Sequence, residues 1–223
     1  MNTDASLFRF QQASLGYAGS PVLRELTLEL RRGEKVALLG ESGTGKSTLL
    51  RRLRELRPAE VAWCPQQPGL VPVLSAFHNI YMGRLERHPF WYNLANLVWP
   101  LAGPRAEIAT LATRLGLGDQ LWRATEQLSG GQQSRVSLGR ALYQEKPIFI
   151  GDEPVSALDE HQADELLRLV CGQHETVVLA LHNVEQALTH CTRVVGLSEG
   201  RLVLDAATDA LTAAQLHTLY RHH

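Results

Sequence analysis

Two segments of this chain have residue types and spacing suited to phosphate and metal chemistry. The first, Gly40-Glu41-Ser42-Gly43-Thr44-Gly45-Lys46-Ser47, fits the pattern G-x-x-x-x-G-K-[ST], and Thr48 follows it. Glycines let a backbone wrap around phosphates, and successive N–H groups at a helix start attract an anion. We expect Lys46 to reach the β- and γ-phosphates and Ser47 to be a ligand of Mg²⁺. This segment therefore predicts a nucleotide-binding loop that includes Thr48.

The second segment, Ile148-Phe149-Ile150-Gly151-Asp152-Glu153, is an apolar run that ends in two carboxylates. We expect Asp152 to hold Mg²⁺, directly or through water, and Glu153 to polarise the attacking water as a general base. An acidic loop after a strand is common by itself, but its place downstream of a glycine loop favours nucleotide hydrolysis. Gly151 stands where a bulkier apolar residue is expected, which predicts looser packing there.

A pentapeptide between these segments, Leu128-Ser129-Gly130-Gly131-Gln132, has the features of a second phosphate site. Ser129 is placed to cap a helix that starts near Gly130. Gly130 and Gly131 leave the surface bare, so a phosphate can approach the positive end of that helix closely.

The elements that must position these residues form an α/β pattern. Strands alternate with helices, which predicts a largely parallel sheet. The expected strands cover residues 7–11, 26–30, 36–39, 60–64, 148–150 and 176–181, with a hairpin of 194–198 and 201–205 around Glu199-Gly200. The expected helices cover residues 46–54, 106–115, 130–143 and 160–171.

The chain is expected to be a single domain, residues 1–223, with two lobes. Residues 1–66 and about 141–223 form the nucleotide-binding α/β core, and residues about 67–140 form an inserted helical lobe. Four aromatic residues lie between Pro89 and Pro104: Phe90, Trp91, Tyr92 and Trp99. We expect them to pack within the lobe rather than to form a cofactor site.

Composition excludes several classes of protein. The 223 residues are 44% hydrophobic and 20% charged with a net charge of −1, which is typical of a soluble globular protein and does not indicate nucleic-acid binding. No apolar run approaches the roughly 20 residues that span a bilayer, and the N-terminus does not resemble a signal peptide. Cys64, Cys171 and Cys191 form no CxxC pair, which argues against a disulfide framework or a zinc site and fits a reducing cytoplasm.

The order of the glycine loop, Leu-Ser-Gly-Gly-Gln and Asp152-Glu153-Pro154 resembles the ATP-binding subunit of ABC transporters over nearly the whole chain. The resemblance implies a P-loop NTPase core with a helical subdomain, ATP and Mg²⁺ as cofactors, and ATP hydrolysis. Only twenty positions separate Lys46 from Gln66, which predicts a reduced antiparallel β-subdomain.

The resemblance also assigns roles to single residues. Tyr17 is expected to stack on adenine, and His182 to contact the γ-phosphate. Gln66 is expected to join the two lobes and to sense Mg²⁺ and the attacking water, although the adjacent Gln67 is an alternative. Asp159 ends the Ser156-Ala157-Leu158-Asp159 loop, which is expected to cross a dimer interface.

The partners follow from the same resemblance. Ser129, Gly130, Gly131 and Gln132 are expected to contact ATP held by a second ATPase subunit, most simply in a homodimer. Residues 68–82 are expected to bind a transmembrane permease, with a periplasmic solute-binding protein as an indirect partner. The subunit is then peripheral to the cytoplasmic face of the inner (plasma) membrane.

The cargo is suggested by a further resemblance. Residues 74–85, followed by Pro89-Phe90-Trp91, are similar to the phosphonate-import ATPases. The alternatives are an importer of another small polar solute, such as phosphite or an amino acid, and an accessory ATPase of a soluble phosphonate-processing complex.

Overall fold

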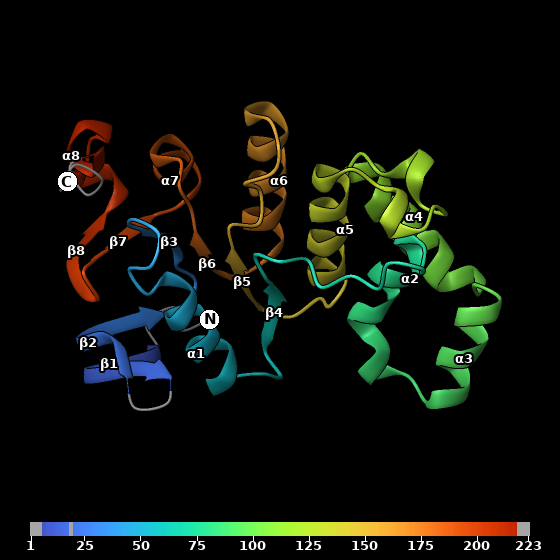
Figure 1. The fold of residues 1–223 in the computed structure, drawn as a ribbon, viewed down its shortest axis with the longest axis horizontal. Helices are drawn as coiled ribbons and strands as arrows, with labels where there is room; N and C mark the ends of the chain where they lie inside the picture. Colours follow the sequence, from blue (N-terminus) through green and yellow to red (C-terminus); the bar gives the residue numbers. More distant parts are fainter. Residues whose placement is uncertain (1–5, 18–19, 218–223) are drawn as a thin grey trace.

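A mostly parallel six-stranded sheet forms the centre of the molecule. The computed structural model describes residues 6–17 and 20–217, and Figure 1 shows the strands in the order β4-β5-β6-β3-β7-β8. The strands β3 to β7 pair in parallel, including β4 with β5, and β8 pairs antiparallel to β7. Their bounds are Lys35–Leu39 (β3), Val61–Cys64 (β4), Ile148–Asp152 (β5), Thr176–Ala180 (β6), Arg193–Ser198 (β7) and Arg201–Ala207 (β8). The α/β fold expected from the sequence is confirmed.

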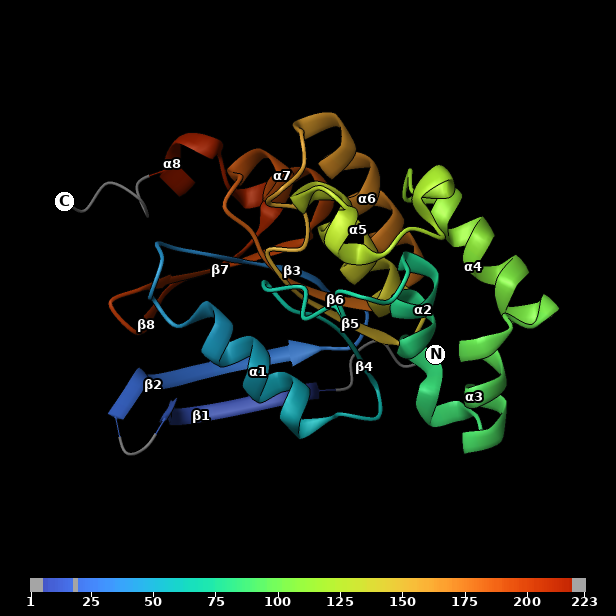
Figure 2. The ribbon, with the colours of Figure 1, turned by 45° about the vertical axis from the view of Figure 1, so that its right-hand side comes forward.

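The core has two halves because side chains alternate across each strand. Val36 and Leu38 of β3 pack into one half, together with apolar residues of α1 (Lys46–Leu56) and of a separate hairpin. Ala37 and Leu39 pack into the other, together with α6 (Glu160–Gln173), α7 (Val184–His190) and the helices that follow β4. Figure 2 shows α1 and the hairpin on the opposite side of the sheet from α6 and α7.

The N-terminal hairpin is longer than the sequence indicates. The expected strands 7–11 and 26–30 are parts of β1 (Ser6–Tyr17) and β2 (Ser20–Arg31), each of 12 residues. Register shifts interrupt the pairing at several points between Ser6 and Gly16, yet the two strands stay paired as far as Tyr17 and Ser20. The expected loss of β structure after the glycine loop is confirmed, since only a turn of residues 57–60 joins α1 to β4.

Helices occupy the chain between β4 and β5. In this described stretch the β pairing is a single bridge, Ser75 with Ala124. The helices are α2 (Ala76–Tyr81), η1 (Met82–Arg87), α3 (Phe90–Val98), α4 (Ala102–Arg114), η2 (Gly118–Gln120), η3 (Thr125–Gln127) and α5 (Gly130–Leu142). They gather at one end of the long axis in Figure 1, and η4 (Thr208–Ala210) and α8 (Ala213–His217) lie at the other.

The aromatic residues of α3 do not pack within the helices around them. Phe90, Trp91 and Trp99 are 67%, 76% and 78% exposed, so the expectation of ordinary packing is wrong for them. The buried residue of this helix is Asn96, whose amide donates to the Tyr92 carbonyl at 3.2 Å. A polar residue thus occupies the inner face, and the apolar side chains are turned outward.

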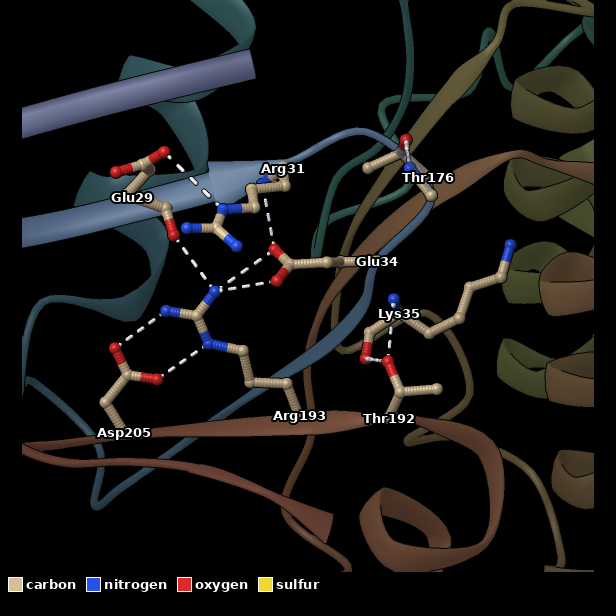
Figure 3. A network of polar contacts seen from close by, with 9 residues as sticks. Glu29, Arg31, Glu34, Lys35, Thr176, Thr192, Arg193 and Asp205 are labelled. Carbon is tan, nitrogen blue, oxygen red and sulfur yellow. Dashed lines mark hydrogen bonds and ion pairs between the residues drawn. The ribbon is translucent and has the colours of Figure 1, made fainter. Parts of the chain in front are cut away.

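Arg193 joins the hairpin to the edge of the main sheet, as Figure 3 shows. Its guanidinium donates to both oxygens of Asp205 at 2.6 and 2.7 Å and to those of Glu34 at 2.9 and 3.1 Å. It also donates to the Glu29 carbonyl at 3.0 Å. The hydrogen bonds that Arg193 donates to Asp205 are the main reason why the pKa of Arg193 is raised. The Arg193 side chain therefore holds β2, β7 and β8 together at the amino end of β7, away from the glycine loop at the carboxyl ends of the parallel strands.

Replacing Arg193 with Ala is expected to lower the free energy of unfolding by about 3 kcal/mol, because two partly buried carboxylates lose their common partner. Chemical denaturation of both proteins measures the change. Arg201→Ala is the matched control, since Arg201 pairs with Glu25 on an exposed surface and should cost no more than about 0.5 kcal/mol. Equal losses in the two variants would contradict a special role for Arg193.

Candidate functional site

Most of the residues singled out in the sequence meet at one edge of the sheet. The carboxyl ends of β4, β5, β6 and β3 are neighbours in the strand order. Gln66 follows β4, Asp152 ends β5 and Glu153 comes directly after it, His182 follows β6, and the glycine loop follows β3. Ligands of open α/β sheets bind outside the carboxyl ends of the strands, so this edge is the candidate site.

The glycine loop has a backbone that other residues adopt only with strain. Gly40, Gly43 and Gly45 have φ of 144°, 83° and 106°. A Cβ on Gly40 would lie 2.2 Å from the Leu197 carbonyl oxygen, whereas one on Gly43 would meet nothing within 4 Å. Gly40 is thus required by the fold, and Gly43 leaves open space where a ligand can approach.

Lys46 begins α1 directly after this loop. Its ammonium donates to the carbonyls of Gly40 at 2.6 Å and Glu41 at 2.8 Å. Burial lowers the pKa of Lys46, and the carboxylates of Glu153 and Asp152 oppose that shift. The cation is held inside the loop, within reach of any anion that enters it.

A pocket of about 200 Å³ lies over the loop and is bounded by parts of the chain that are distant in sequence. Its lining comprises Val22, Ser42, Gly43, Gly45, Lys46, Ser47, Thr48, Gln66 and Glu153. Gln66 is in this lining and Gln67 is not, which favours Gln66 for the role predicted for one of the two. Val22, from β2, also lines the pocket. The sequence does not indicate this role, except that Val22 comes shortly after Tyr17. The backbone of Tyr17 pairs with Ser20, while its side chain lies outside the described structure.

Asp152 and Ser47 have the chemistry of a magnesium site. Asp152 is buried, and its Oδ1 has no hydrogen-bond partner among the described residues. Burial raises the pKa of this carboxyl, and a hydrogen bond from the Ser47 side chain opposes the rise. Within residues 6–17 and 20–217, no group of three or more His, Cys, Asp or Glu side chains is arranged so that it could hold a metal ion by itself. One carboxylate and one hydroxyl, completed by phosphates and waters, are a donor set that Mg²⁺ accepts, so these residues fit the ion.

Glu153 and His182 form a pair that the sequence did not reveal. His182 Nε2 lies 2.5 Å from Glu153 Oε1, and the histidine is 47% exposed while the glutamate is 14% exposed. Glu153 has a φ of 53°, and its N–H donates to the Ala180 carbonyl at 3.2 Å. A left-handed backbone at a non-glycine residue is costly, and here it aims the carboxylate across the end of β6 toward His182.

The pentapeptide is arranged as expected but lies outside this pocket. Ser129 caps α5 by accepting from the Gln132 N–H at 3.3 Å, and the Gln132 side chain accepts from the Ser129 N–H at 3.0 Å. The Gln132 side chain is thus used in the capping box. A Cβ on Gly130 would meet nothing within 4 Å, so this exposed helix end is bare.

The Ser156–Asp159 loop lies against the same helix end. A Cβ on Gly131 would be 3.1 Å from the Ala157 carbonyl oxygen, so a larger residue would require the loop to move by a few tenths of an ångström. Asp159 caps α6 by accepting from the Gln162 N–H at 3.0 Å. None of Ser129, Gly130, Gly131, Gln132 and Asp159 is among the described residues that line the glycine-loop pocket.

The expectation of loose packing at Gly151 is wrong. A Cβ there would lie 2.9 Å from Phe149 Cε1 and 3.0 Å from both Leu179 Cδ2 and Pro154 Cγ. The neighbouring side chains already fill the space, so the small residue is needed for β5 to pack.

Comparisons with known proteins show what the whole chain is similar to. The family described as ABC transporter matches residues 23–60 and 52–156. The Phosphonates import ATP-binding protein PhnC of Anaeromyxobacter dehalogenans (strain 2CP-C) is 38% identical over 92% of the chain, and the chain spans 47% of that protein's length. The Phosphonates import ATP-binding protein PhnC 2 of Pseudomonas aeruginosa (strain UCBPP-PA14) is 36% identical over 91% of the chain and 86% of its own length.

Solved structures show the same fold. A dimeric post-hydrolysis state of an ATP-binding cassette bound to ADP and Pi has a TM-score of 0.76 and 23% identity, covering 90% of this chain and 98% of its own. The structure of cbiO1 from Clostridium perfringens has a TM-score of 0.73 and 21% identity, covering 96% and 93%.

Proposed function

Because the chain belongs to the ABC transporter family as an ATP-binding subunit, we propose that it hydrolyses ATP to power the import of phosphonates. The observation that carries the cargo is its similarity, at 36–38% identity over more than nine tenths of its length, to subunits named for phosphonate import. The observation that carries the chemistry is the meeting of the glycine loop, Asp152, Glu153 and His182 at one sheet edge.

Within the site, each residue has a distinct task. Lys46 leaves the carbonyls of its own loop and pairs with the phosphates of ATP, while the loop N–H groups bind the same anion. Asp152 and Ser47 hold Mg²⁺, which when bound neutralises charge on the phosphates. Glu153 accepts a proton from the attacking water, and His182 holds that carboxylate in position. Gln66, at the end of β4, faces the same pocket.

The bare end of α5 supports an assembly of two subunits. Ser129 and Gly130 present a capped, exposed helix end that fits a phosphate but does not line the pocket of their own chain. The ATP of one subunit is therefore sandwiched against the Ser129–Gln132 turn and the Asp159 loop of a second copy. The two nucleotides close this homodimer.

The remaining partners are those that an ATPase subunit of an importer requires. We place the lobe boundaries at residues 67 and 140, with the helical lobe contacting a transmembrane permease through residues 68–82. A periplasmic binding protein delivers the solute to that permease. The described part of the chain holds no helix long and apolar enough to cross a bilayer. We propose that the permease holds the subunit at the cytoplasmic face of the inner membrane.

Replacing Lys46 with Ala is expected to weaken ATP binding by about 10- to 100-fold, because a charge-assisted bond to the phosphates is lost. Titration calorimetry with ATP and Mg²⁺ measures the affinity. Arg52→Ala removes an exposed cation from the same helix and serves as the control, with unchanged affinity expected. Equal affinity in the Lys46 variant would refute the assignment of the pocket.

The cargo is tested with the subunit co-expressed with the permease from its own gene neighbourhood. In vesicles that contain the complex and its solute-binding protein, an alkylphosphonate is expected to stimulate ATP hydrolysis several-fold. Phosphite and amino acids are the comparison solutes, and stimulation by one of them instead would replace phosphonate as the cargo. Recovery of the subunit in a soluble complex that lacks a permease would overturn the transport role.

A further inference from the structure

The helix α3 (Phe90–Val98) has its polarity inverted relative to a helix on the surface of a globular domain. Its fully buried residue is Asn96. The apolar side chains are exposed by 39% to 78%, and they are Phe90, Trp91, Leu94, Leu97, Val98 and, at the C-cap, Trp99. Water therefore meets the side of the helix that usually faces a core.

Hydrogen bonds and one stacked pair of rings hold this helix to the protein, since the ring centroids of His88 and Tyr92 lie 4.4 Å apart. The Tyr81 hydroxyl donates to Asn93 Oδ1 at 2.8 Å, and Asn93 Nδ2 donates to the carbonyls of Leu85 at 3.0 Å and His88 at 3.1 Å. Asn96 Oδ1 accepts from the Leu101 N–H at 3.1 Å. Asn93 and Tyr92 contact the segment before α3, and Asn96 is buried on the inner side, so the outward position of the apolar side is built into the fold.

The outward face is continuous from Phe90 to Val98, and the exposed Trp99 follows it at the C-cap. At 100° per residue, Phe90, Trp91, Leu94, Leu97 and Val98 fall on one half of the helix. Large aromatic side chains each cover roughly 150–250 Å², so this face exposes on the order of 500 Å² of apolar surface. Patches of about 300–600 Å² are the largest on typical monomers and are often functional.

The chemistry of this face distinguishes between kinds of partner. A protein interface of this area carries about one hydrogen bond per 100–200 Å², which amounts to several bonds. The side chains of this face offer only the indole N–H groups of Trp91 and Trp99. Residues 89–104 also contain no Asp, Glu, Lys or Arg. The hydrocarbon of a lipid bilayer requires no hydrogen-bond donors or acceptors from the protein. Tryptophan rings are also enriched where the hydrocarbon meets the headgroups.

We propose that α3 is a membrane-interface helix whose outward face, from Phe90 to Trp99, inserts into the headgroup boundary of a lipid bilayer. The helix lies at one end of the long axis in Figure 1, so it can meet a surface without moving the sheet. The contact orients the helical lobe toward the bilayer. It depends on apolar burial and not on ATP or cargo, so it stands or falls separately from the transport role.

The test is flotation of the purified full-length protein with vesicles. One vesicle type is neutral phosphatidylcholine, and the other is a mixture of phosphatidylethanolamine and phosphatidylglycerol. The protein is expected to float with both types and to remain bound at high salt, because the face carries no charge. Its tryptophan emission is expected to shift to the blue, and lipids brominated near the headgroup are expected to quench it.

The matched variants are Trp91→Ser combined with Trp99→Ser, and Val203→Ser as the control. Val203 is an exposed apolar residue of β8, outside α3 and outside the segment assigned to the permease. The double variant is expected to lose about tenfold or more of vesicle affinity, since binding scales with the buried apolar area, and Val203→Ser is expected to lose none. Because both tryptophans are exposed, the thermal midpoint and the ATP affinity should stay unchanged in the double variant.

Several results would overturn the proposal. One is failure of the wild-type protein to float with either type of vesicle. If that protein still binds a detergent-solubilised permease through α3, then α3 is a protein-binding helix and the proposal is wrong. Another is binding to anionic vesicles alone that disappears at high salt, which would indicate adsorption through charges elsewhere. A third is a double variant that floats as well as the wild type. A fourth is a wild-type protein that self-associates without vesicles and a double variant that differs from it only by being monomeric, which would make α3 a contact between copies of the chain.

Discussion

Glu153→Gln is expected to lower the rate of ATP hydrolysis by about 10²–10³-fold while leaving ATP affinity within about twofold of the wild type. The side chain keeps its size and can still hydrogen-bond to His182, which now lies 2.5 Å from Oε1. What it loses is the capacity to accept a proton from water. The backbone tolerates the change, because Gln and Glu meet the same strain at a φ of 53°.

The measurements are single-turnover hydrolysis and nucleotide titration of the same preparation. Glu185→Gln, which removes an exposed carboxylate from the first turn of α7, is the control and should hydrolyse ATP normally. Since ATP is bound but not consumed, the Glu153 variant should also accumulate as a dimer in light scattering. Normal turnover in this variant would refute the role of general base.

Ser129→Arg, introduced into the Glu153→Gln background, is expected to abolish ATP-dependent dimer formation and to leave ATP binding by each monomer intact. The arginine projects from the bare end of α5, where a phosphate held by the other subunit must approach. That end does not line the pocket of its own chain, so the affinity of the monomer for ATP should not change. Light scattering and titration calorimetry measure the two properties separately.

The loss of the cap needs its own control. Ser129 accepts from the Gln132 N–H, and removing this bond costs about 1 kcal/mol of helix stability in any variant. Ser129→Ala loses the same cap without adding bulk, so it should still dimerise, with an affinity weakened by no more than about tenfold. If Ser129→Ala and Ser129→Arg fail to dimerise equally, blockage of the helix end is not the cause. If the arginine variant dimerises normally, the sandwich arrangement is wrong.

Much of the site could be predicted because its residues act through local backbone geometry. Gly40 and Gly43 have positive φ, Ser129 caps a helix, and Asp152 ends a buried strand. Each requirement involves only a few consecutive residues and restricts which residue types are allowed, so it leaves a readable pattern. The parallel sheet is predictable for the same reason, since short apolar runs alternate with helical segments.

What the sequence left undecided depends on contacts between distant segments. The length of β1 and β2 depends on their pairing across register shifts. The tight packing around Gly151 depends on Leu179 from another strand, and the choice of Gln66 over Gln67 depends on which of them faces a loop twenty residues earlier. Composition alone does not encode such contacts.

By itself, the sequence determined that the chain binds and hydrolyses a nucleotide, because phosphate chemistry needs glycine, lysine and carboxylate at fixed local spacings. Only the tertiary structure decided which side of each element faces water. The aromatic residues of α3 read as core residues in the sequence, yet Asn93 and Asn96 hold the other side of that helix inward. Orientation follows from the sum of contacts with neighbouring elements, and those contacts exist only once the chain is folded.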